Sequence, residues 1–148
     1  MKKKFVLIAL IMVVYFGSFA QVFNEILKTN ADPNRQVNAI YGQTVYVAGN
    51  YAAVGAQSED LPGGLTNAGA VYVWEKENEC DWQMVQVLTA SDASAGDSFG
   101  SDVDISGDYM IVGAQLEAHG MIGQGAAYIF ERNVAGVWIE KQKIVASD

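Results

Sequence analysis

The stretch that decides the fold is FGSDVDISGDYMIVGAQ, residues 99–115, because YGQTVYVAGNYAAVGAQ, residues 41–57, follows the same pattern earlier in the chain. Both stretches open with an aromatic residue and a glycine, and both close on Val-Gly-Ala-Gln with the same number of residues between. Self-similarity of this kind is the sequence signature of repeat architectures. The chain is therefore predicted to build one structural unit twice.

The repeat continues beyond these two stretches. The copies align at a spacing of 58 residues up to Gln57 and Gln115, and at 56 residues afterwards, because the loop of the second copy is two residues shorter. A change of spacing confined to one loop indicates equivalent elements joined by variable connections. The residues shared by both copies include Tyr51/Tyr109, Gly55/Gly113, Gly69/Gly125, Tyr72/Tyr128, Glu75/Glu131, Trp82/Trp138 and Gln86/Gln142.

Each copy predicts four short strands and no helix. In the second copy the expected strands are residues 102–106, 109–114, 126–131 and 138–146. A Gly-Asp turn, a glycine-rich loop and an Asn-Val-Ala-Gly turn separate them, and all three are turn signals. The matching turns of the first copy are residues 49–50, 58–69 and 77–81.

The hydrophobic pattern indicates how these strands are covered. AVYVWE at residues 70–75 and AAYIFE at residues 126–131 are apolar at successive positions, which predicts cover on both faces. The fourth strand is more polar and is expected to be outermost. A propeller blade has this profile, because neighbouring blades pack on both of its faces. The predicted fold is therefore all-β, with two four-stranded antiparallel β-propeller blades; an ordinary sandwich would explain the strands but not the repeat.

The motifs also resemble a known family. Phe99-Gly100 followed by Gly113-Ala114-Gln115 resembles the FG-GAP repeat, the blade of the integrin α-subunit head. The second copy is similar to a bacterial exported version of that repeat, through ASD at 90–92, AGDSFG at 95–100, ISGD at 105–108 and GAAYIF at 125–130. The first copy has Tyr41 in place of Phe, and both copies end in Gln where the family has Pro. The resemblance implies a β-propeller, commonly of seven blades, with extracellular recognition and no particular chemistry.

The first twenty residues predict export. Three lysines precede an apolar run over residues 5–16, and Gly17-Ser18-Phe19-Ala20 supplies the small residues of a signal-peptidase site. An uncleaved anchor is the alternative, but a spanning helix needs about 20 apolar residues and this run is shorter. Cleavage is expected after Ala20, and the mature protein is expected to be secreted or held at the cell surface without inserting in the membrane.

Charge and cysteine content exclude several classes of function. Removing residues 1–20 leaves six basic and seventeen acidic residues, a net charge of −11. Nucleic acids and anionic lipids both require a basic face, so neither is expected as a partner. Cys80 is the only cysteine, which excludes a disulfide scaffold. We interpret it as an incidental loop residue.

No metal site is predicted. Integrin blades hold calcium through carboxylates at alternate loop positions, and loops 58–68 and 116–124 lack that spacing. Four other acidic residues, Asp92, Asp97, Asp102 and Asp104, bracket Phe99-Gly100. Asp102 and Asp104 would share a strand face and could share a cation. The favoured interpretation is that Asp92 and Asp97 organise turns and that Asp102 and Asp104 are solvated.

No catalytic residue or cofactor is predicted either. Ser-His-Asp catalysis would need His119, which lies in a loop, but the chain has no Gly-x-Ser-x-Gly motif to supply the serine nucleophile. No carboxylate pair stands out as a glycosidase site. Trp74, Trp82 and Trp138 could stack on a sugar, but the last two occupy equivalent places, which favours packing. The predicted function is macromolecular recognition or adhesion, with an extracellular protein or polysaccharide as partner and binding residues undetermined. The alternative is the N-terminal part of a propeller hydrolase or lyase whose catalytic residues lie in further blades.

The expected organisation has four parts. These are a signal peptide at 1–20, a lead-in at 21–34, and FG-GAP-like blades at 35–92 and 93–148, the two blades differing mainly in loops 58–68 and 116–124. Two blades alone would leave an inner face in water, and repeat folds generally need about three units. The chain is therefore expected to be part of a longer propeller. Residues 22–32 resemble the outermost strand and are expected to be a strand that closes the ring.

Overall fold

The computed structural model describes residues 36, 38–78, 81–118 and 123–146. Over these residues it contains eight strands and no helix, so the prediction of an all-β fold is confirmed. Among the same residues there is consequently no apolar helix of membrane-spanning length. The predicted signal peptide and the strand expected at 22–32 lie outside the described residues, as do Cys80 and His119.

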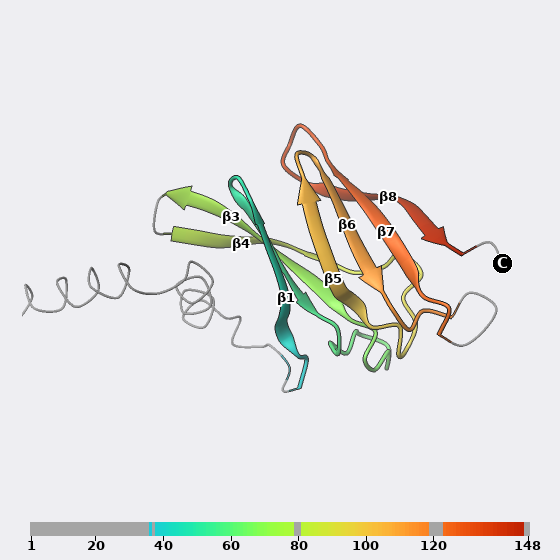
Figure 1. The fold of residues 1–148 in the computed structure, drawn as a ribbon. Coiled ribbons are helices and arrows are strands. Elements are labelled where there is room, and N and C mark those ends of the chain that lie inside the picture. Colours follow the sequence, from blue (N-terminus) through green and yellow to red (C-terminus); the bar gives the residue numbers. More distant parts are fainter. Residues whose placement is uncertain (1–35, 37, 79–80, 119–122, 147–148) are drawn as a thin grey trace, which may run out of the picture. The chain divides into compact units, whose positions relative to one another are not determined.

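The strands form two separate four-stranded sheets in which sequence neighbours pair antiparallel (Figure 1). The first sheet, which we call blade 1, has the order β1 (Tyr41–Ala48), β2 (Tyr51–Ala56), β3 (Ala70–Asn78), β4 (Asp81–Leu88). The second, blade 2, has the order β5 (Phe99–Ser106), β6 (Tyr109–Ala114), β7 (Ala126–Arg132), β8 (Trp138–Val145). The two sheets confirm the predicted pair of propeller-type blades.

The two blades share their irregularities as well as their strands. In each, the pairing of the first two strands shifts register just after the aromatic-glycine pair, between Tyr41 and Val45 in blade 1 and between Phe99 and Asp102 in blade 2. Gly42 and Gly100 lie at these bulges with φ of +87° and +84°, a conformation that only glycine adopts without strain. The bulge therefore explains why both copies begin with an aromatic residue and a glycine.

The main hydrophobic core lies between the two sheets. One face of blade 1 packs on one face of blade 2, and alternate residues of the inner strands point into the contact. Phe99 sits at its centre, fully buried, with its ring edge-on to Tyr128 at 5.4 Å between centroids. Blade 1 contributes Tyr51, Ala53, Val71, Val73, Leu88 and Ala90, and blade 2 contributes Phe99, Val103, Ile105, Met110, Val112, Ala114, Tyr128, Phe130 and Trp138.

Glycines allow the backbones of the two blades to touch. A Cβ atom on Gly55 would lie 2.1 Å from the carbonyl oxygen of Gly100, and one on Gly69 would lie 2.1 Å from that of Phe99. Gly69 and Phe99 also form a parallel bridge, and Phe99 N donates to Ala68 O at 2.9 Å. The Phe-Gly of blade 2 therefore packs against the Gly-Ala segments of blade 1, where no side chain fits.

One prediction about burial is wrong. Residues 70–74 of β3 are buried at every position, as their apolar run predicts. Residues 126–131 are not: β7 alternates between buried residues such as Tyr128 and Phe130 and half-buried ones such as Ile129. The second face of blade 2 has no sheet packed on it within the described residues, so its apolar side chains reach the surface.

Candidate binding surface

The two loops that differ most between the copies lie at the same end of the blades (Figure 1). Loop 58–68 joins β2 to β3, and loop 116–124 joins β6 to β7, with residues 119–122 outside the described part. Loops on a rigid scaffold commonly carry binding residues because they can vary without disturbing the core. This end of the molecule is therefore the candidate binding surface.

A row of glutamine side chains crosses this end from one blade to the other. Gln57 Nε2 donates to Gln43 Oε1 within blade 1, and Gln115 Nε2 donates to Gln57 Oε1 of blade 1 at 3.3 Å. Gln43 and Gln115 are exposed, and Leu116, the residue after Gln115, is 52% exposed. A carboxamide both donates and accepts, so the row offers paired hydrogen-bonding groups next to an apolar side chain.

Loop 58–68 is held in shape by internal hydrogen bonds. The carboxylate of Asp60 accepts from Asn67 N at 2.7 Å and from Gln36 Nε2 at 2.5 Å, which closes the base of the loop. Gly96 N donates to Thr66 O at 2.8 Å, which ties the loop to the connection between the blades. Only residues 62–64 at the tip are free to face solvent as a group. The loop is thus a structured projection.

A charged network lies beneath the second loop. Lys143 Nζ on β8 lies 2.7 Å from both Asp92 Oδ2 and Glu117 Oε1, and 5.5 Å from the centre of the Tyr128 ring. Tyr128 OH donates to Asp92 Oδ1 at 2.8 Å. Glu117 is buried and Asp92 is about half exposed. The ammonium group therefore joins the start of the glycine-rich loop to the connection between the blades.

The pKa values of this network reflect the mutual contacts. Burial raises the pKa of the Tyr128 hydroxyl, and its hydrogen bond to Asp92 raises it further. Desolvation acts to lower the pKa of Lys143, but hydrogen bonds to Asp92 and Glu117 outweigh it and raise that pKa. Desolvation acts to raise the pKa of Asp92, but the hydrogen bonds from Lys143 and Tyr128 outweigh it and lower that pKa. Each group is thereby held in its ordinary protonation state at neutral pH.

The structure separates the four acidic residues around Phe99-Gly100. Asp97 is buried and its carboxylate accepts from Ser94 N at 2.7 Å, which confirms its predicted role in a turn. Asp92, also predicted to organise a turn through its own backbone, has a hydrogen bond from its own backbone and in addition binds Tyr128 and Lys143. Asp102 and Asp104 are exposed on one face of β5, as predicted.

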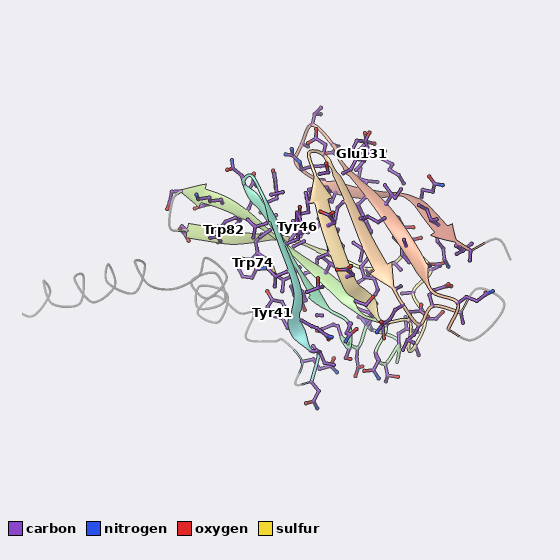
Figure 2. All side chains as sticks on the ribbon, viewed as in Figure 1. Tyr41, Tyr46, Trp74, Trp82 and Glu131 are labelled. Atoms are coloured by element: carbon purple, nitrogen blue, oxygen red, sulfur yellow. The ribbon has the colours of Figure 1, made fainter. Side chains whose placement is uncertain are left out.

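The exposed pair of aspartates faces the first strand of blade 1. Thr44 Oγ1 donates to Asp102 Oδ1 at 3.3 Å, and a hydrogen bond to Asp104 raises the pKa of Tyr46 (Figure 2). Within the described residues, no three His, Cys, Asp or Glu side chains are placed to hold a metal ion. The carboxylates of this region are thus engaged by neighbouring side chains of the protein.

The three tryptophans are packing residues, as the equivalent places of Trp82 and Trp138 in the two copies predict for that pair. Trp74, Trp82 and Trp138 are at most 5% exposed. Trp138 packs edge-on against Tyr51 with 5.8 Å between centroids, and Trp74 Nε1 donates to Tyr41 OH at 3.1 Å. None of them offers a ring face to a sugar.

Sequence reasoning missed both the glutamine row and the Lys143 network. A signal for the glutamine row was present in the repeat, because Gln57 matches Gln115. For the Lys143 network the repeat marks only the acidic member, because Glu59 matches Glu117 at the same spacing. The partner Lys143 has Val87 as its counterpart, so no repeated residue pointed to the ion pair.

Comparison with known proteins agrees with the motifs. A search of the curated proteins found no match to the chain. The sequence profile of the FG-GAP repeat matches residues 82–130, which run from β4 of blade 1 through β7 of blade 2. The family's sequence repeat therefore spans the contact between the blades, including the close approach of Phe99-Gly100 to blade 1. The chain thus contains an FG-GAP repeat at residues 82–130, as the motifs in its sequence predict.

Proposed function

We propose that this protein is an exported recognition module that binds an extracellular macromolecule through the end formed by loops 58–68 and 116–124. The observation that carries the proposal is the glutamine row. Three carboxamides, at the repeated Gln57 and Gln115 positions and at Gln43, cross both blades, and the exposed Leu116 follows Gln115 in the chain. Amide groups next to an apolar side chain suit a protein ligand, because they match both its backbone and its side chains.

The proposal is of a non-catalytic module. Its support is that the two groups with large pKa shifts, Tyr128 and Lys143, both hydrogen-bond to Asp92. A catalytic acid or base needs a pKa near the working pH and access to substrate. Here the perturbations move the pKa of each group away from neutrality, and Tyr128 is fully buried.

The experiment begins with the full-length chain carrying a C-terminal tag and expressed in a bacterial host. Export predicts that the protein is recovered outside the cytoplasm with Gln21 at its N-terminus. The purified protein is then labelled and tested on arrays of extracellular proteins and of polysaccharides. Binding to a protein spot should be lost in the Gln115→Ala/Leu116→Asp double variant.

The matched control is Val134→Ser. Val134 is fully exposed in the turn between β7 and β8, at the opposite end of blade 2 (Figure 1), so its substitution should leave binding unchanged. Cytoplasmic retention with an uncleaved N-terminus would refute export. Binding that survives the double variant, or that Val134→Ser abolishes, would refute the assignment of this end.

A further inference from the structure

The connection between the two blades is held on blade 2 by side chains rather than by strand pairing. Leu88 ends β4 and Phe99 begins β5, and we call residues 91–96 between them the strap. Ala90 and Phe99, on either side of the strap, are buried in the core, whereas most strap residues are exposed. Apolar burial therefore fixes the two ends of the connection, and its middle depends on polar contacts.

Two side chains of β8 and one of β7 hold the first half of the strap. The carboxylate of Glu140 accepts from Ser91 N at 2.9 Å and from Ser91 Oγ at 2.7 Å. Lys143 Nζ donates to Asp92 Oδ2 at 2.7 Å, and Tyr128 OH donates to Asp92 Oδ1 at 2.8 Å. We call these five residues and their contacts the clasp.

The repeated fold does not itself require the clasp. At the positions of Glu140 and Lys143, the first copy has Met84 and Val87. A thioether is only a weak acceptor and a valine side chain has no polar atom, so neither can replace the carboxylate or the ammonium group. Strand β4 forms nonetheless, so these two side chains of β8 serve the connection between the blades rather than the sheet.

A carboxylate accepts at each side-chain contact of the strap. Besides Asp92 and Glu140, the buried carboxylate of Asp97 accepts from Ser94 N at 2.7 Å. Protonation removes the negative charge that strengthens such hydrogen bonds and that pairs with a lysine. The bond from Gly96 N to Thr66 O, at 2.8 Å, has a backbone carbonyl as acceptor and does not titrate. Acid therefore acts on the contacts to blade 2 and spares the contact to blade 1.

The packing of the two sheets does not depend on these charges. Among the described residues, the core cluster between the sheets contains no carboxylate and no basic side chain. The other charged groups beside the clasp are Glu117, 2.7 Å from Lys143 Nζ, and the pair of Lys141 and Glu131 at 3.2 Å. Neither pair includes a strap residue. The strap can therefore open locally while the sheets stay packed.

We propose that the clasp is an acid-sensitive device: protonation of Asp92 and Glu140 detaches the strap from blade 2 while the two blades stay folded. Aspartate and glutamate are ionised at neutral pH, so the clasp is closed there. The strap adjoins both loops of the candidate binding surface, because Gly96 N donates to Thr66 O and Leu116 N donates to Asp97 O at 3.2 Å. Acid thus loosens that end of the molecule, whatever ligand it binds.

Amide hydrogen exchange, followed by NMR on residues 21–148, tests the proposal. Ser91 and Ser94 are the reporters because their amides donate to carboxylates, and Gly96 is the internal control because its amide donates to a carbonyl. The protection factors of the two serines should fall at least about tenfold between pH 7 and about pH 3, because hydrogen bonds to charged acceptors are lost. The pKa of Asp92 is lowered in the folded protein, so its contacts should be lost at the acid end of this range.

Three further observations decide between a clasp and separate contacts. At pH 7, Lys143→Met should lower the protection of Ser91 at least about threefold, although Lys143 contacts Asp92 and not Ser91. Lys141→Met is the matched control, since Lys141 pairs with Glu131, and it should leave Ser91 unchanged. Gly96 should stay protected, and the buried Val112 should keep its native chemical shift throughout.

Three results would overturn the proposal. Equal protection of Ser91 at pH 7 and at pH 3 would show that acid does not open the strap. Unchanged protection of Ser91 in Lys143→Met would show that the contacts do not act together. Loss of the native Val112 signal at the same pH as the protection of Ser91 would show that acid unfolds the blades instead of releasing the strap.

Discussion

Lys143 makes ion pairs that the first copy cannot make, since valine occupies the equivalent position in blade 1. Its ammonium group bridges two carboxylates with unequal exposure: the side chain of Glu117 is 9% exposed and that of Asp92 is 49% exposed. A buried charge that loses its partner is strongly destabilising, whereas an exposed one is solvated by water. The two ion pairs of Lys143 therefore contribute differently to stability.

Lys143→Met is predicted to lower the free energy of unfolding by about 2–3 kcal/mol, because it leaves Glu117 buried without a cation. Asp92→Asn is predicted to lower it by no more than about 1 kcal/mol, since solvent screens that carboxylate. Urea unfolding of residues 21–148 at pH 7 measures both. Lys141→Met is the control: Lys141 pairs with Glu131 at 3.2 Å on the surface, and its loss should change stability by about 0.5 kcal/mol or less.

The pH dependence of the same variants gives a second readout. The pKa of Asp92 is lower in the folded protein than in the unfolded chain, so its contribution is present above the unfolded pKa and is lost as pH falls through the folded value. Stability of the wild type should therefore fall below about pH 4. Asp92→Asn should show a shallower fall, and an identical acid limb in both proteins would contradict the assignment.

Among the elements, strand β5 begins earlier than its sequence pattern predicts. Phe99-Gly100 was expected to precede a strand over residues 102–106, yet β5 begins at Phe99, because a glycine bulge lets the pair join the ladder opposite Ala114. Hydrophobic periodicity marks regular strands and does not register a bulge.

The strands, their order and the turns between them could be predicted from the repeat, because the two copies show the same pattern. Contacts such as Lys143–Glu117 and the glutamine row depend on which loop ends meet in space. Residue spacing along one chain does not encode those distances, so only the structure could place them.

Loop 58–68 is predicted not to bind calcium tightly. The carboxylate of Asp60 in this loop already accepts hydrogen bonds from Asn67 N and Gln36. A ligand that binds only the folded state raises the unfolding temperature. Calcium is added at about 100 times a micromolar dissociation constant, where tight binding would raise the free energy of unfolding by about 2.7 kcal/mol. The unfolding temperature of residues 21–148 is therefore expected to stay unchanged. A calcium-dependent rise that is lost in Glu59→Gln/Asp60→Asn would show that the loop is a calcium site.

At the scale of the whole molecule, two equivalent sheet faces have different surroundings. The face of blade 1 is packed on Phe99, Met110 and Trp138 of blade 2, whereas the equivalent face of blade 2 is half in water. Of the two equivalent sheet faces, only that of blade 1 is packed on another sheet within the described residues. Gly55 and Gly113 lie at the same place on these two faces, and neither has the positive φ that would itself forbid alanine.

The most direct test of this asymmetry is urea unfolding of residues 21–148 carrying Gly55→Ala or Gly113→Ala. The two substitutions reduce the entropy of the unfolded chain equally, so their difference reports on the folded neighbours. Gly55→Ala is predicted to lower the free energy of unfolding by about 3 kcal/mol, because its methyl group meets the backbone oxygen of Gly100. Gly113→Ala is predicted to change it by less than about 1 kcal/mol, since the closest atom is the movable Ser101 hydroxyl at 3.3 Å and Asp102 lies at ordinary contact distance. Losses of equal size would show that the two faces are in equivalent surroundings and would contradict the packing of blade 2 on blade 1.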